Sequence, residues 1–76
     1  MKIYIINGTG DDGNWYLSAH STLEKAVLRM KSHIEILTVM YDLTAEEWEI
    51  EEDFLMAKYD DGSHYDSFWI EEVELL

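Results

Sequence analysis

The sequence predicts one α+β domain: a four-stranded, mainly antiparallel sheet in the order ββ-α-α-ββ, with one long and one short helix on one face. Three observations lead to this fold class. Apolar residues alternate near both ends of the chain, they recur at helical spacing between residues 23 and 40, and Asp-Asp-Gly occurs twice where a hairpin would turn. The 76 residues suffice for a single domain, residues 1–76, with one core.

The first two strands are expected to form a hairpin. Residues 2–7 have apolar side chains on both faces, which favours a strand in the middle of the sheet. Residues 14–20 follow as the returning strand, with Trp15, Leu17 and Ala19 facing inward. Residues 8–13 match the G-x-G-x-x-G pattern of dinucleotide sites, but no helix follows to receive a pyrophosphate. We therefore interpret them as a turn.

A long helix is predicted from the middle of the chain. Ser21-Thr22-Leu23-Glu24 fits a capping box, in which a hydroxyl and a carboxylate bind free N–H groups at a helix start. The residues that follow form an amphipathic stripe at three- and four-residue spacing: Leu23, Ala26, Val27, Met30, Ile34, Leu37 and Tyr41. Because β-branched residues after His33 also suit a strand, we place the end of the helix near Met40.

Two periodicities compete after the second capping box, Thr44-Ala45-Glu46-Glu47. Trp48, Glu52 and Leu55 fit a helix, whereas Trp48, Ile50, Phe54 and Met56 fit a strand. We expect a short helix to about Glu52. A hairpin of residues 54–59 and 64–75 should follow, with a β-bulge at Glu71-Glu72 that brings Phe68, Ile70, Val73 and Leu75 to one side.

The net charge of −12 lies entirely in the second half of the chain. Residues 1–40 have four Lys or Arg and four acids, which sum to zero. Residues 41–76 have Lys58 and thirteen acids, and 1 − 13 = −12. Direct binding to DNA, RNA or an anionic membrane is disfavoured, because each phosphate contact needs a cation. A basic protein partner is favoured.

The residue inventory does not predict an enzyme, a cofactor or a metal. The chain has no Cys, its three His form no H-E-x-x-H motif, and residues 60–66 contain only fragments of a calcium loop. We therefore predict no catalytic residue. The absence of Cys suits a reducing compartment, and the first apolar run, residues 3–6, is too short for a secretory signal or a membrane span. These observations predict a cytoplasmic protein.

The acidic segment 46–53 is the first candidate for partner binding. On a helix rising about 1.5 Å per residue, its six carboxylates would give about one charge per 2 Å, close to the ~1.7 Å of duplex DNA. The alternative is a solvated acidic surface. The predicted partner-binding residues combine this segment with later acids and two tryptophan anchors: Glu46, Glu47, Trp48, Glu49, Glu51, Glu52, Asp53, Asp60, Asp61, Asp66, Trp69, Glu71, Glu72 and Glu74.

A second hypothesis places partner binding on aromatic residues. If helices cover one face of the sheet, Tyr4, Tyr16, Tyr65 and Trp69 are expected on the other. Such a patch is typical of interface hot spots or of a homodimer. The alternative is that these rings fill the core. This hypothesis predicts a homodimeric structural or adaptor module.

Three short segments resemble small phage and bacterial proteins that begin with a hairpin and end with an acidic strand. They are Met1-Lys2-Ile3-Tyr4-Ile5-Ile6, Ser21-Thr22-Leu23-Glu24-Lys25-Ala26 and Trp69-Ile70-Glu71-Glu72-Val73-Glu74-Leu75. In composition, the acidic second half is similar to phage-encoded inhibitors of the anti-CRISPR and anti-restriction type. The resemblance implies an inhibitor that occupies a basic nucleic-acid-binding surface of a host protein. It assigns no functional residue.

Overall fold

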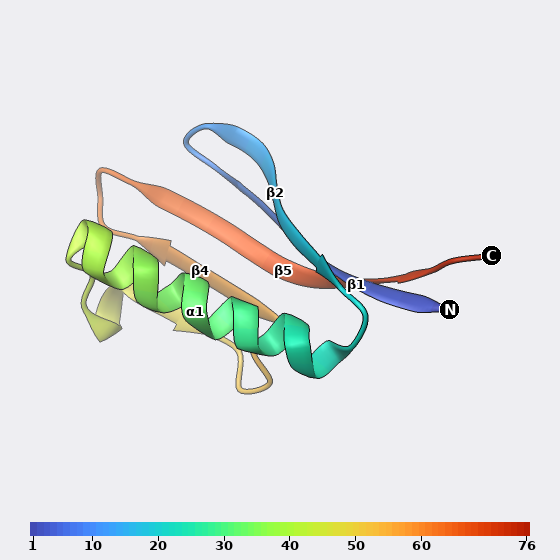
Figure 1. The fold of residues 1–76 in the computed structure, drawn as a ribbon. Coiled ribbons are helices and arrows are strands. Elements are labelled where there is room, and N and C mark those ends of the chain that lie inside the picture. Colours follow the sequence, from blue (N-terminus) through green and yellow to red (C-terminus); the bar gives the residue numbers. More distant parts are fainter.

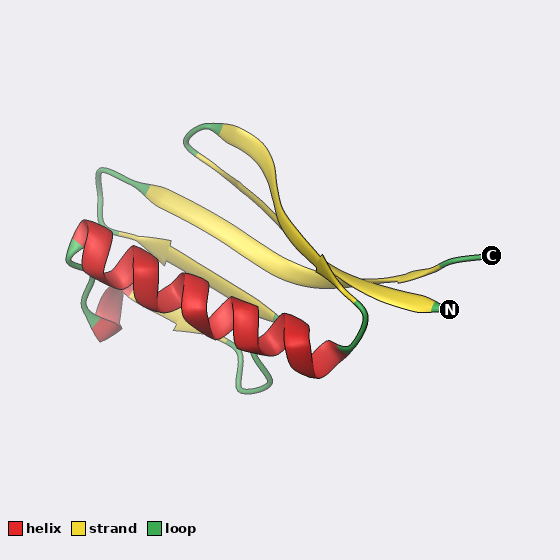
Figure 2. Ribbon diagram, in the orientation of Figure 1, coloured by secondary structure: helices red, strands yellow, loops and turns green.

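A five-stranded antiparallel sheet has one helix lying across one of its faces, and the computed structural model describes all of residues 1–76 (Figure 1). The strands are β1 (Lys2–Gly10), β2 (Gly13–His20), β3 (Trp48–Ile50), β4 (Met56–Asp60) and β5 (Tyr65–Glu74). The helix is α1 (Leu23–Tyr41), and a single 3₁₀ turn, η1, spans Ala45–Glu47. Figure 2 shows both chain termini at one end of the sheet, beyond the start of α1.

The strand order is β2-β1-β5-β4-β3, so the first and last strands of the chain form the centre of the sheet. β1 and β5 pair without interruption from Lys2 opposite Glu74 to Gly10 opposite Asp66. The predicted α+β class agrees broadly with this architecture. The predicted four-stranded sheet with two helices is wrong, because the chain forms five strands and one α-helix.

The predicted second helix is a 3₁₀ turn followed by a strand. Thr44 and Glu47 do form a capping box, but the helical turn ends at Glu47. β3 pairs with β4 so that Trp48 lies opposite Tyr59 and Ile50 opposite Ala57, which places both apolar residues on the face that α1 covers, with Trp48 packed against the core. An α-helix would instead have placed carboxylates at repelling i,i+4 positions. Residues 48–50 therefore follow the two-residue period of a strand and not the period of a helix.

The predicted β-bulge in the last strand is also wrong. Pairing of β5 with β1 is continuous through Glu71 and Glu72, so Phe68 and Ile70 face α1 while Val73 faces the other side. The irregularity lies in β2, where the register against β1 shifts between Ile6 and Asn7. The extra residue, Leu17, packs against the core.

The helix begins and ends close to the predicted positions, with a different cap. The Thr22 hydroxyl accepts the Lys25 N–H at 3.2 Å, so Thr22 rather than Ser21 is the N-cap. Asp42 ends the helix in the left-handed conformation, and its N–H is donated to the Thr38 carbonyl. Both Asp-Asp-Gly sequences form hairpin turns, and Gly13 and Gly62 take φ of 90°, which favours glycine.

Strand register divides the sheet into a covered face and an open face. On the covered face, Ile6, Ala57, Tyr59 and Phe68 pack with Met30 and Leu37 of α1 to form the core. We call the opposite side of the sheet, which α1 leaves uncovered, the open face. By register it presents Ile3, Ile5, Asn7, Thr9, Asn14, Tyr16, Ala19, Glu49, Met56, Lys58, Asp60, Tyr65, Ser67, Trp69, Glu71 and Val73. The prediction that Ala19 faces inward is therefore wrong, because it pairs with Ile5 on the open face.

Candidate partner-binding face

A shallow acidic hollow of about 350 Å³ is lined mainly by open-face residues of β3, β4 and β5 and by two glutamates of η1. Its floor is a cross-strand row in which Glu49 lies opposite Lys58 and Lys58 opposite Ser67. Lys58 Nζ pairs with Glu49 Oε2 at 3.2 Å and is the only cation in the lining. The acids that line the hollow are Glu46, Glu47, Glu49, Asp60 and Asp66, so its formal charge is 1 − 5 = −4.

The next cross-strand rows of the open face are largely apolar. Met56, Trp69, Asn7 and Tyr16 lie side by side across four strands. The Tyr16 side chain is exposed, whereas Trp69 is partly buried by its neighbours. Asn7 of this row donates its Nδ2–H to Glu71 Oε2 at 3.0 Å. The open face therefore passes from an acidic end to an apolar, aromatic region within a few residues.

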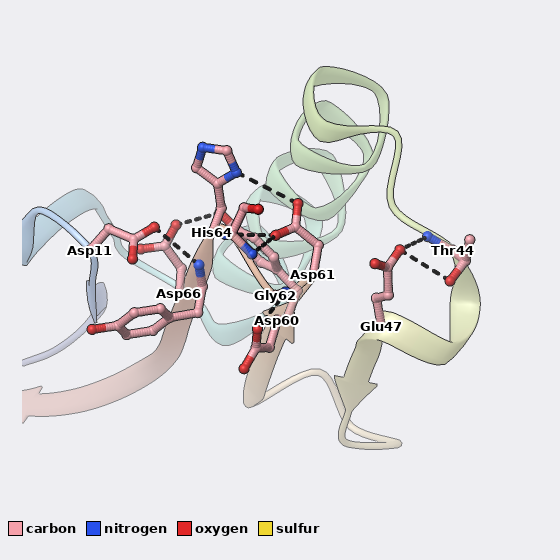
Figure 3. Close-up of polar contacts among 11 residues, drawn as sticks. Asp11, Thr44, Glu47, Asp60, Asp61, Gly62, His64 and Asp66 are labelled. Carbon is pink, nitrogen blue, oxygen red and sulfur yellow. Dashed lines mark hydrogen bonds and ion pairs between the residues drawn. The ribbon is translucent and has the colours of Figure 1, made fainter.

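Several of the predicted acids stabilise turns. Figure 3 shows Asp60, Asp61 and His64 in the β4–β5 turn, between Asp11 on one side and the Thr44–Glu47 cap on the other. Asp61 Oδ1 accepts the N–H groups of Ser63 and His64, and Asp60 Oδ1 accepts that of Gly62. The backbone N–H groups of His64 and Ser63 lower the pKa of Asp61. These carboxylates have a structural role whether or not a partner binds.

Asp66 is held on the covered side of β5 by two aromatic donors. Trp15 Nε1 donates to Asp66 Oδ1 at 3.2 Å, and the Tyr59 hydroxyl donates to Oδ2 at 2.6 Å. Burial, followed by this hydrogen bond, raises the pKa of Tyr59. Although Asp66 borders the hollow, its carboxylate is committed to the core, so we exclude it from the surface that can contact a partner.

Trp48 does not lie where a partner anchor would. Its side chain faces α1, where Nε1 donates to Thr38 Oγ1 at 3.0 Å and the ring contacts Tyr59 and Phe68. The prediction that Tyr4 lies on the open face is also wrong. Tyr4 pairs with Glu72 on the side of the sheet that α1 occupies. Of the two predicted tryptophan anchors, Trp69 alone lies on the open face.

The remaining predicted acids are spread over separate regions instead of forming one line. Glu72 accepts the Tyr4 hydroxyl and lies 3.8 Å from Lys2 Nζ, and Glu74 lies 3.6 Å from the N-terminal amine. In the β3–β4 connection, Asp53 accepts the Leu55 N–H. The side chains of Glu46, Glu51 and Glu52 form no hydrogen bond or ion pair. With no helix over 46–53, the DNA-like linear spacing of carboxylates is lost.

The G-x-G-x-x-G match has a packing explanation. A Cβ at Gly8 would overlap the Trp15 ring, and one at Gly10 would overlap the Asp66 carboxylate and the Tyr65 carbonyl. Because they have no side chain, the two glycines leave room for the Trp15 ring and the Asp66 carboxylate to form their hydrogen bond. Sequence reasoning missed Asn7, Met56, Lys58 and Ser67, because only the pairing of distant strands brings these ordinary residues to one face.

A scan against family models, a search of curated proteins and a search of solved structures each returned no match. The resemblance to phage inhibitors therefore stays a prediction. No helix has the length and apolar character needed to cross a membrane. No three His, Cys, Asp or Glu side chains are grouped as metal ligands.

Proposed function

We propose that this protein is a protein-binding inhibitor or modulator that occupies a basic, nucleic-acid-binding surface of its partner through the open face. The observation that carries the proposal is the acidic hollow, where four carboxylates besides the core-bound Asp66 surround one lysine that is already paired. A cationic side chain entering this hollow meets a negative potential on several sides. The proposal concerns a folded acidic face and requires no helical mimic of DNA.

The neighbouring aromatic region supports the proposal because charge alone gives a short-lived complex. Complementary charge mainly raises the association rate and selects the partner, whereas buried aromatic contacts slow dissociation. Trp69 and Tyr16 lie in the row beside the hollow's floor. A partner with Arg or Lys next to an apolar patch would contact both regions at once. Such surfaces are common in proteins that bind nucleic acids through phosphates and stacked bases.

The test is capture from a nuclease-treated bacterial lysate on immobilised protein, followed by elution with a short DNA duplex or with RNA. We expect the nucleic acid to release nucleic-acid-binding proteins, because it competes for the same basic surface. A triple variant, E46Q/E49Q/D60N, removes three of the hollow's five negative charges and should lose most of this capture. The control D12N/E24Q/D42N changes the net charge equally at exposed acids elsewhere and should retain it.

Two results would count against the proposal. Proteins that stay bound when nucleic acid is added do not use a nucleic-acid-binding surface. Equal capture by the two triple variants would show that only the overall charge matters. The first result would exclude a nucleic-acid-binding surface on the partner, and the second would exclude a specific role of the hollow.

A second candidate function, a homodimeric or adaptor module, is favoured by the aromatic residues of the open face. Met56 and Trp69 are neighbours in one cross-strand row there, Tyr16 lies in the same row beyond Asn7, and α1 does not cover this row. This alternative predicts binding that survives high salt and is lost in Y16A or W69A. Capture that resists 1 M NaCl but fails in W69A would favour it over a basic partner.

A further inference from the structure

The two hairpin turns of the sheet contain the same three residues, Asp-Asp-Gly. Asp11-Asp12-Gly13 leads from β1 into β2, and Asp60-Asp61-Gly62 leads from β4 toward β5. Both glycines take φ of 90°, and a Cβ on either one would meet no atom within 4 Å. The space around the two Asp-Gly sequences is therefore equally open, and any difference in their reactivity depends on what the aspartates contact.

An Asp-Gly sequence can rearrange without an enzyme. The glycine nitrogen attacks the carboxyl carbon of aspartate and forms a C–N bond, and a carboxyl oxygen leaves as water with the amide and carboxyl protons. Glycine favours this step because no side chain hinders its nitrogen. Water then opens the five-membered succinimide ring. Attack at the side-chain carbonyl restores aspartate, whereas attack at the main-chain carbonyl gives isoaspartate, whose main chain is one carbon longer.

In the β4–β5 turn, both reacting groups are engaged in hydrogen bonds. Asp61 Oδ1 accepts the N–H of Ser63 at 2.8 Å and that of His64 at 2.6 Å (Figure 3). The Gly62 N–H, whose nitrogen would have to attack, donates to Asp60 Oδ1 at 2.9 Å. The N–H groups of His64 and Ser63 also lower the pKa of Asp61, which reduces the neutral carboxyl form that loses water readily. Rearrangement at Asp61 therefore requires this turn to open.

In the β1–β2 turn, the first aspartate is held and the second is not. Asp11 Oδ2 accepts the Tyr65 N–H at 3.1 Å, and the Asp11 N–H donates to the Tyr65 carbonyl at 3.3 Å. Asp12 is exposed, and its carboxylate forms no hydrogen bond or ion pair. Gly13 lies opposite Gly10 in the last pair of the hairpin, where main-chain hydrogen bonds open most readily. The Asp12 carboxyl is thus free to turn toward the Gly13 nitrogen.

A third sequence of this kind, Asn7-Gly8, is protected by the fold. Asn-Gly forms the same ring faster than Asp-Gly in flexible peptides, because a neutral amide is attacked more readily than a carboxylate. In the folded chain, Asn7 lies in β1 between Tyr16 and Trp69, and its side-chain amide donates to Glu71. Gly8 is buried. The main chain here cannot bend toward the ring without breaking the centre of the sheet.

We propose that Asp12-Gly13 is a site of spontaneous isoaspartate formation in the folded protein, whereas Asp61-Gly62 and Asn7-Gly8 are not. The rearrangement releases one water and takes up one water, so mass and net charge stay the same. It lengthens the main chain beside Asp11, which is hydrogen-bonded to Tyr65 in the lining of the acidic hollow. The product is therefore a second form of the protein, altered next to the hollow. The proposal is independent of the proposed function.

The test is a tryptic peptide map of the full chain after several weeks in mildly acidic buffer. Cleavage after Lys2, Lys25 and Lys58 places the two Asp-Gly sequences on separate peptides, residues 3–25 and 59–76. An isoaspartate peptide elutes separately at unchanged mass, whereas deamidation of Asn7 raises the mass, and electron-transfer fragmentation assigns the modified residue. We expect Asp12 to rearrange about tenfold faster than Asp61, because the Asp61 turn must first lose charge-assisted hydrogen bonds.

A denatured sample and one variant provide the controls. In guanidinium chloride, Asn7 should react first, and Asp12 and Asp61 should rearrange at similar rates, because the folded contacts are absent. D12E keeps the charge and should abolish the new peak from residues 3–25, because glutamate would have to form a less favourable six-membered ring. Equal rates at Asp12 and Asp61 in the folded protein would overturn the proposal. Deamidation of Asn7 ahead of Asp12, or an unmodified Asp12 in the folded sample, would overturn it as well.

Discussion

The two faces of the sheet use the same residue types differently. On the covered face, Tyr59 is 3% exposed and donates to Asp66, whereas Tyr16 on the open face is 62% exposed and its hydroxyl has no partner within the chain. Trp48 is fixed by a hydrogen bond to Thr38, while Trp69 has none. Register, more than residue type, therefore decides which aromatic and acidic residues hold the fold together and which are free to meet a partner.

The largest expected difference between the faces concerns two aromatic residues of β5. Phe68 is fully buried, and F68A should cost about 3–5 kcal/mol of unfolding free energy, because it removes the ring and leaves a cavity. Y65A, three residues earlier on the open face, should cost less than about 1 kcal/mol. Urea unfolding followed by circular dichroism measures both values.

A loss of 3–5 kcal/mol is a large part of the stability of a domain this small. If F68A does not fold, F68L provides the comparison, with a smaller loss of the same sign. Equal losses for F68L and Y65A would show that the two faces are not distinguished as the strand register indicates.

A matched pair of tyrosines tests the next effect. Y59F removes the donor to the Asp66 carboxylate and should cost about 1.5–3 kcal/mol, the usual range for hydrogen bonds to charged groups. Y16F removes an exposed hydroxyl and should change stability by less than about 0.5 kcal/mol. Urea midpoints of the two variants give the comparison directly. A neutral Y59F would mean that Asp66 does not depend on this donor.

The sequence predicts local structure well where one signal dominates. The helix from Leu23 to Tyr41 follows from its amphipathic period, and both Asp-Asp-Gly turns occur as expected. Where two periods competed, at Trp48, the helical interpretation failed. The deciding contacts, Trp48 with Thr38 and β3 with β4, join residues that no local pattern connects.

The candidate site was less predictable than the fold for the same reason. The acids of the second half are evident in the sequence, but their roles depend on neighbours brought together by folding. Asp61 and Asp66 are tied to turn and core donors, and Trp48 is turned toward α1. Composition predicts that a surface is acidic, whereas only strand pairing shows that Glu49, Lys58 and Ser67 form one row.

The smallest expected effect is a pH dependence that arises on the covered side. Burial, and then the nearby Arg29 guanidinium, lower the pKa of His33 below its ordinary value of 6.5, while Asp66 opposes the shift. The His33 ring packs against Trp15 and Phe68, 5.5 and 5.0 Å between centroids. The folded protein therefore holds this imidazole neutral under conditions where the unfolded chain protonates it.

The sign of the effect follows from proton linkage. Because the folded pKa lies below the unfolded one, the unfolded state binds more protons, and stability falls as the pH drops below about 6.5 toward the folded pKa. The contribution is complete above pH 6.5. H33F keeps an aromatic ring and removes the titration, so its urea stability should change less than that of the wild type between pH 7.5 and 5.5. Equal changes in unfolding free energy for the two proteins over this pH range would show that folding does not lower the pKa of His33.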